Sequence, residues 1–214
     1  SLNFFLVAPL LHLPFSPTVH PMLEGVFNLL LSWAAMFAGF FSDERRDKPN
    51  LFQIFPAVVG MQFLTSAFLL PYLVLRSSED RTDVQFGELS TPARLLESKL
   101  LSPILGVVGS GSIAWAFLGR PEFGSLAERW GSFIELLSID RVGSSFLVDL
   151  AIFALFQGYF VGDDLKRRGT SSGRMGALAL VGKYVPFFGL AGYLACRPSY
   201  PNETGEKPSL ESVR

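Results

Sequence analysis

The chain has 214 residues, of which 49% are hydrophobic and 17% are charged, below the roughly 25% charged residues of typical soluble domains. A net charge of −1 argues against nucleic-acid binding, which needs a basic face. The single cysteine, Cys196, excludes an intrachain disulfide and a multi-cysteine metal site. Charges gather between long apolar runs, so we expect an integral membrane protein, an all-α polytopic bundle of transmembrane helices.

In chain order, residues 2–15 come first; they are apolar but short and interrupted by prolines, and we place them at the membrane interface. Five later runs have about the 17–25 residues that cross a hydrocarbon core as a helix. Prolines inside the second and fifth runs are expected to kink those helices. Four or six spans remain open alternatives. The expected spans are residues 22–41, 51–75, 101–118, 144–161 and 177–194.

The third expected span is rich in small residues. Another helix can approach its backbone closely at three positions without a side chain, Gly106, Gly109 and Gly111. We therefore expect these glycines to lie at helix–helix contacts within the bundle.

Two connecting segments read as short amphipathic helices. Thr91 is a good N-cap, and Pro92 suits the first helical position of the segment that follows. In residues 121–139, apolar side chains recur at helical spacing around Trp130, which suits a helix lying along the membrane surface or one packed on the protein's own loops. The tail, residues 197–214, is polar and is expected to be extended unless a partner orders it.

Charge does not decide the orientation of a five-span bundle. The basic segment 163–174 predicts a cytoplasmic or stromal face for its own end of the fourth span. With five spans, the cluster of Arg45, Arg46 and Lys48 falls on the opposite face. The two signals conflict, and the topology stays open.

Polar residues inside the expected spans are the first candidates for a functional site, because each ionisable group there costs at least about 2.5 kcal/mol on insertion scales. Asp149 and Lys183 can form a buried pair if one span is tilted; otherwise Lys183 reaches the interface and Asp149 bonds a neighbouring helix. The structural alternative is favoured. The intramembrane polar candidates are Glu24, Asn28, Asp149 and Lys183.

His20 lies just before the first span, four residues from Glu24. An interfacial histidine can serve as the axial ligand of a chlorophyll, so His20 is a candidate pigment ligand. Two such residues do not complete a metal site, and we predict no metal. The alternative is a histidine with ordinary polar partners, beside a first-turn carboxylate that interacts with the helix dipole.

Catalytic motifs are absent from the sequence: it has no GxSxG or HExxH motif, and the glycines of residues 106–111 lack the context of a phosphate loop. Catalytic residues therefore stay unassigned, and enzyme activity has no positive support. Helices kinked by prolines are compatible with transport.

Two stretches resemble a known but poorly characterised group. HPMLEGVFNLLLSWAAMFAGFFSDERRDKPN begins at His20, and SSFLVDLAIFALFQGYFVGDDLKRRG begins at Ser144. They resemble polytopic membrane proteins of unknown function from plants, algae and cyanobacteria, sent to the chloroplast in plants. The second stretch is also similar to bacterial membrane domains of unknown function and to a plastid membrane protein needed for neoxanthin formation. The resemblance covers roughly half of the chain. It implies a thylakoid or inner-envelope location and a removed transit peptide, and it transfers no site residue.

Three functions follow as hypotheses. The first is a non-catalytic membrane subunit or assembly factor of a photosynthetic or other plastid membrane complex, in contact with lipid and with other membrane subunits. The second is a membrane enzyme or binding protein for an isoprenoid pigment, with chlorophyll, carotenoid or lipid as the bound molecule. The third is a small transporter.

Overall fold

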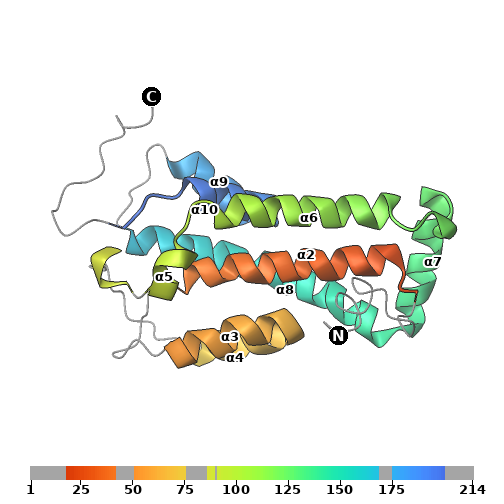
Figure 1. Cartoon of the computed structure of the whole chain (residues 1–214), viewed down its shortest axis with the longest axis horizontal. Coiled ribbons are helices and arrows are strands. Elements are labelled where there is room, and N and C mark those ends of the chain that lie inside the picture. Colours follow the sequence, from red (N-terminus) through yellow and green to blue (C-terminus); the bar gives the residue numbers. More distant parts are fainter. Residues whose placement is uncertain (1–17, 42–50, 76–85, 90, 169–174, 201–214) are drawn as a thin grey trace.

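The computed structural model describes residues 18–41, 51–75, 86–89, 91–168 and 175–200, and the description below concerns these residues. Every regular element among them is helical, which confirms the expected all-α class (Figure 1). In chain order the elements are α2 (Pro21–Phe37), η2 (Ala38–Phe40), α3 (Leu51–Leu64), α4 (Ser66–Leu75), η3 (Phe86–Glu88), α5 (Thr91–Leu96), α6 (Leu101–Leu118), η4 (Pro121–Phe123), α7 (Leu126–Ile139), α8 (Arg141–Arg167), α9 (Met175–Tyr184) and α10 (Phe188–Cys196).

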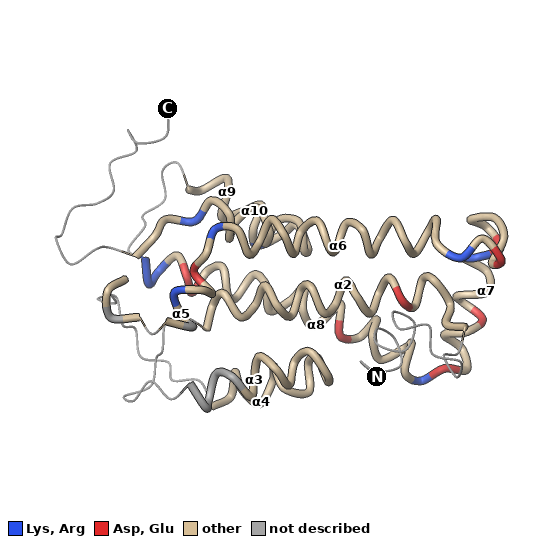
Figure 2. Tube along the Cα trace, viewed as in Figure 1, with Lys and Arg blue, Asp and Glu red and all other residues tan. Residues whose placement is uncertain are grey.

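Three helices are long and apolar enough to cross a membrane: Pro21–Phe40 (α2 with η2), α6 and α8. They run side by side along the long axis of the molecule (Figure 1). Charged residues gather at the two ends of the described bundle, and few lie between them (Figure 2). We name these ends the α5 end and the α7 end after the short helices found there. This arrangement supports a membrane protein with three candidate spans.

The second expected span does not run straight, because it is broken at Thr65 into α3 and α4. Thr65 has a φ of 38°, a left-handed conformation that turns the chain back on itself. The two helices then pack on each other, with Gly60 of α3 against the ring of Phe68 in α4. Residues 51–75 therefore form a helical hairpin and not a crossing.

The fifth expected span is broken in the same way, between Tyr184 and Phe188. Phe187 has a φ of 58° at the turn. Gly182 of α9 lies against Tyr193 of α10, so the two helices fold back on each other. The described chain thus contains three candidate spans and two hairpins, α3–α4 and α9–α10, where we expected five spans.

Both hairpins start and finish at the α5 end, because α2 and α8 each run from the α7 end to the α5 end (Figure 1). α2 ends and α3 begins at this end, and α8 ends there too, so a three-span arrangement does not put the two charge signals in conflict as five spans do. Arg45, Arg46 and Lys48 themselves lie outside the described residues. Among the described residues, the α5 end carries Arg94, Lys99, Lys166, Arg167, Arg168 and Arg197, and the α7 end carries Arg120, Arg129 and Arg141.

The α2 helix is the centre of the bundle. Of the residues in the apolar stretch of each candidate span, 72% are buried inside the protein in Pro21–Phe40, compared with 22% in α6 and 33% in α8. The aromatic side chains of α2 interlock with those of α8, as in the contacts of Phe37 with Phe153 and Phe160. Since α6, α8 and the two hairpins all pack around α2, its burial comes from protein contacts and not from lipid.

The connecting helices follow the sequence prediction in part. α5 is a short helix that ends at Leu96, and α7 is a longer helix that lies across the end of the bundle (Figure 1). Ser125 and Glu128 form a capping box at its start. Phe133 faces the protein, and Trp130 is exposed. Residues 2–15 lie outside the described part, and so does the tail beyond Tyr200; the described residues Arg197 and Tyr200 are buried, so the tail's first residues pack on the bundle.

Candidate functional site

Asp149 of α8 binds the turn of hairpin α3–α4. Its two carboxylate oxygens accept hydrogen bonds from the hydroxyls of Thr65 and Ser66. The carboxylate is buried, as 8% of the residue is exposed. Asp149 is therefore engaged with a neighbouring helix, which is the structural alternative considered for it.

Gln157, two turns further along α8, binds the turn of hairpin α9–α10. Its amide nitrogen donates to the carbonyl oxygens of Gly182 (2.7 Å) and Val185 (2.9 Å), and its amide oxygen accepts from the backbone N–H of Phe187 (3.1 Å). Non-helical backbone at membrane depth needs such partners, because lipid offers none. The search of the sequence for ionisable groups missed Gln157, because its amide carries no charge.

Lys183 lies in α9 and does not pair with Asp149, whose oxygens are bonded to Thr65 and Ser66. Its ammonium group packs beside Gly162 of α8, one turn before that helix ends. Because α9 starts at the α5 end, Lys183 and Asp149 belong to different depths of the bundle.

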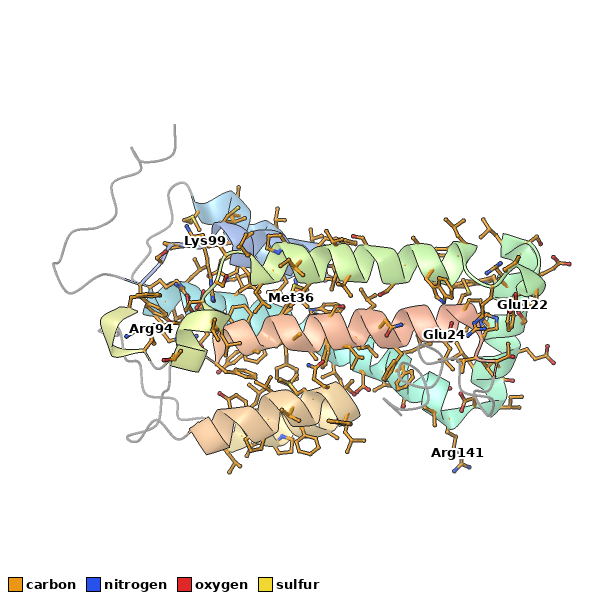
Figure 3. All side chains as sticks on the ribbon, viewed as in Figure 1. Glu24, Met36, Arg94, Lys99, Glu122 and Arg141 are labelled. Carbon is orange, nitrogen blue, oxygen red and sulfur yellow. The ribbon has the colours of Figure 1, made fainter. Side chains whose placement is uncertain are left out.

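Glu24 sits at the α7 end of α2, between α2 and α6 (Figure 3). Its carboxylate forms a two-point contact with Arg120 at 2.7 and 3.0 Å and accepts from the indole N–H of Trp115 at 2.8 Å. The ion pair raises the pKa of Arg120, chiefly through its hydrogen bonds with Glu24. Since both partners come from α6 or the residues just after it, Glu24 ties α2 to α6 at this end.

His20 caps the start of α2. Its Nδ1 accepts from the backbone N–H of Met22 at 3.2 Å, and its Nε2 lies 3.0 Å from the hydroxyl oxygen of Ser132 in α7. The ring packs between Phe123 and Phe133, and burial lowers its pKa. Both ring nitrogens are engaged, so an axial-ligand role would require Ser132 to give up its contact.

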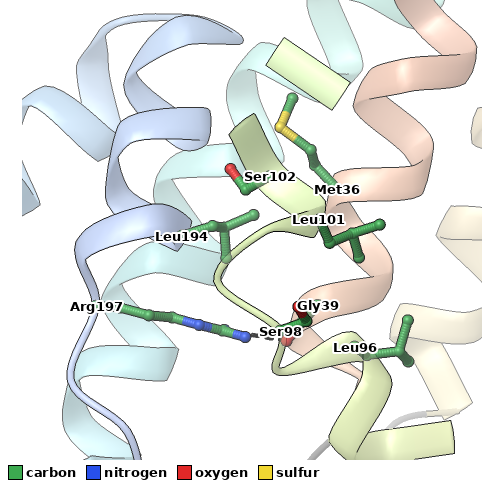
Figure 4. Close-up of a pocket in the computed structure, with 8 residues that line it drawn as sticks. All are labelled: Met36, Gly39, Leu96, Ser98, Leu101, Ser102, Leu194 and Arg197. Atoms are coloured by element: carbon green, nitrogen blue, oxygen red, sulfur yellow. Dashed lines mark hydrogen bonds between the residues drawn. The ribbon is translucent and has the colours of Figure 1, made fainter. Parts of the chain in front are cut away.

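A buried charge network at the α5 end joins α8, α10 and the segment after α5. Arg168 binds both carboxylate oxygens of Glu97 at 2.9 Å and Asp164 at 2.9 Å. Arg197 also binds Glu97, at 2.9 Å, and donates to the carbonyl oxygen of Gly39 at 3.0 Å (Figure 4). The sequence predicted only a basic segment here, because which charges pair with one another across segments depends on the fold.

The three glycines singled out in α6 face different neighbours. Gly109 lies against the ring of Phe187, at the turn of hairpin α9–α10, and Gly106 lies against Ala191 of α10. Gly111 has no neighbour within 4 Å of the position that a methyl group would take. Two of them thus allow the second hairpin to approach α6, and the third lines an open space.

That space is a groove of about 500 Å³ between α2 and α6, with α3 closing one side. Its polar lining includes Asn28 and Gln62, and the Gln62 amide nitrogen is buried with no hydrogen-bond partner among the described residues. The ten residues that line it carry no charge: they are Asn28, Leu31, Ser32, Ala35, Gln62, Leu105, Val108, Gly111, Ser112 and Trp115.

Within the described residues, no group of three or more His, Cys, Asp or Glu side chains could hold a metal ion. No protein-family model, curated protein or solved structure matches this chain. Three kinds of feature among the described residues are candidate sites. They are the groove, the two anchors on α8 and the ion clusters at the two ends.

Proposed function

We propose that this chain is a non-catalytic integral membrane subunit or assembly factor of a plastid membrane complex, photosynthetic or otherwise. The observation that carries the proposal is the contrast between α2 and α6. Both are long apolar helices, yet α6 leaves most of its surface facing outward. The thylakoid or inner-envelope location comes from the sequence resemblance and belongs to the same proposal.

The outward face of α6 suits a neighbouring transmembrane helix. Val107, Ser110, Ala114 and Leu118 follow helical spacing along one exposed stripe. Ser110 and Ala114 form a pair of small residues four apart, a spacing that lets a partner's backbone approach closely in a membrane. Outward residues of α8 are bulkier, as in Leu155 and Tyr159. We therefore assign the partner contact to α6.

The transporter hypothesis gains less support. Asp149, which a transporter would use to bind an ion, has both carboxylate oxygens engaged by hydroxyls of one hairpin turn. Glu24 is likewise held by Arg120 and Trp115. Groups held by internal partners favour a structural role over a transport cycle.

The test is purification of the tagged full chain from its native membrane in mild detergent, followed by native gel analysis and mass spectrometry. We expect a complex larger than the monomer. Ala114→Trp places a bulky ring on the stripe and should reduce recovery of the partner. The matched control is Ala151→Trp, on the exposed face of α8, which should recover it as the unsubstituted chain does. Recovery of a free monomer from native membranes would refute the proposal.

A further inference from the structure

The groove between α2, α3 and α6 has a buried hydrogen-bond donor without an internal partner. The amide nitrogen of Gln62 is buried without a partner in the described part of the chain, and Asn28 lines the same space. A buried donor that stays unpaired costs about 1–3 kcal/mol, so its presence favours an acceptor supplied from outside. By contrast, the side-chain amide of Gln157 in α8 is bonded within the protein through both its nitrogen and its oxygen.

The depth of the groove limits what that acceptor can be. Asn28 and Ser32 lie seven and eleven residues beyond Pro21, which at about 1.5 Å per residue is roughly 10–16 Å along α2. The hydrocarbon core is about 30 Å thick, so these residues lie near its middle. Ester groups of ordinary glycerolipids stay at the interface, and charged headgroups find no opposite charge among the lining residues.

The volume of the groove and the tryptophan that lines it further restrict the class of ligand. The volume of about 500 Å³ falls within the roughly 300–1,000 Å³ of small-molecule sites. Trp115 lines the groove, and its ring is held in place by the indole hydrogen bond to Glu24. A fixed, half-exposed indole is a stacking surface for a flat ring.

We propose that this groove binds an uncharged lipid of the quinone class, with its ring near Trp115 and a ring carbonyl oxygen accepting a hydrogen bond from Gln62. Such a ring is flat, carries acceptors and no donors, and enters the bilayer interior with its apolar chain. The site is separate from the outward stripe of α6. Ala114 is absent from the lining of the groove, so the two proposals can fail independently.

The experiment titrates the purified full chain in detergent with a decyl-substituted benzoquinone and follows quenching of tryptophan fluorescence. We expect saturable binding of one quinone per chain. Gln62→Leu should weaken it roughly tenfold, because one hydrogen bond is lost. Gly111→Leu places a branched side chain in the groove, at a position where an added Cβ has no neighbour within 4 Å, and should abolish binding. Gly192→Leu, at a position on α10 whose Cβ is equally free of neighbours, should leave binding unchanged. Decylbenzene, which lacks carbonyls, should not bind saturably.

Two results would overturn the quinone site. The first is quenching that rises linearly with quinone in every variant, which indicates simple partition into detergent. The second is unchanged affinity in Gly111→Leu, which places the quinone elsewhere. If the quinone fails to bind and Gly111→Leu instead loses the co-purifying protein, the groove belongs to a partner helix.

Discussion

Hairpin α3–α4 is anchored to α8 by a carboxylate, whereas hairpin α9–α10 is anchored to the same helix by an amide. Asp149 only accepts, and its partners are two side-chain hydroxyls, of Thr65 and Ser66. Gln157 both donates and accepts, and its partners are backbone groups of the turn itself. The chemistry of each anchor matches what its turn leaves unpaired. A carboxylate could not replace Gln157, because it would face two carbonyl oxygens.

The hairpins also differ in their surroundings. The turn of α9–α10 lies inside the bundle, where Phe187 contacts Trp33 of α2 and Gly109 of α6. Hairpin α3–α4 packs on α2 and α8 only at its flank, and Phe63 and Leu64, next to its turn, are exposed. We therefore expect the second hairpin to be the more sensitive of the two to substitution.

The largest expected effect is on the side of the membrane from which cysteines can be labelled, because both hairpins start and finish at the α5 end. In the Cys196→Ser background, Ser98→Cys should react with an impermeant maleimide from the same side of sealed vesicles as native Cys196. Ser138→Cys in α7 should react only from the other side. A five-span chain would place residues 98 and 196 on opposite sides, so opposite labelling would refute the hairpin arrangement. The excess of Lys and Arg predicts a cytoplasmic or stromal α5 end.

Removing the amide anchor should cost the most stability. Gln157→Leu keeps the side chain's bulk but leaves the carbonyl of Gly182 and the N–H of Phe187 without the partner that Gln157 supplies in a fully buried site. The carbonyl of Val185 also loses Gln157 but still accepts from the N–H of Gly189. At about 1–3 kcal/mol for each unpaired group, we expect a loss of about 3–5 kcal/mol. Reversible unfolding in mixed micelles measures it. The control is Leu155→Gln, on the exposed face of α8, which retains every anchor contact; equal stability of Gln157→Leu and the unsubstituted chain would contradict the anchoring role.

The carboxylate anchor should be more tolerant. Asp149→Leu leaves two hydroxyls to find other acceptors, and we expect a loss of about 2 kcal/mol. Asp149→Asn should cost less than about 1 kcal/mol, because a hydroxyl can rotate to accept from the new amide N–H. The same unfolding assay compares the pair. If Asn is as damaging as Leu, the negative charge and not the hydrogen bonds makes Asp149 important.

The smallest expected effect is on stability, when alanine replaces the glycine at which the two helices of each hairpin lie closest together. A methyl group at Gly182 would meet the Cβ of Tyr193 at 2.8 Å, an atom that can move only with the backbone. We expect Gly182→Ala to destabilise the protein by about 1–2 kcal/mol, since overpacking outweighs the gain in helix propensity. At Gly60 the methyl group would lie within 2.5 Å of atoms of the Phe68 ring, but this side chain is 38% exposed and the whole ring can swing outward about χ1. Gly60→Ala should therefore be within about 0.5 kcal/mol of neutral.

The sequence predicts some of the polar residues that matter, but it does not predict their partners. Glu24 and Asp149 were found because a carboxylate in an apolar run is costly. Their partners could not be found, since Thr65 lies 84 residues from Asp149 and Arg120 lies 96 residues from Glu24. Gln157 and Gln62 were passed over, although an amide inside a span also needs a partner. A search for uncharged amides in the apolar runs would have identified both.

The sequence by itself determined the helical class and the positions of α2, α6 and α8, the three helices long and apolar enough to cross a membrane, because these depend on apolar run length and on where charges fall. Only the tertiary structure decided that residues 51–75 and 177–194 fold back. A run of apolar residues can place its side chains in the hydrocarbon core either as one crossing helix or as two shorter helices that pack together. The choice depends on a partner for the turn, and Asp149 and Gln157 supply it from a helix far away in the sequence.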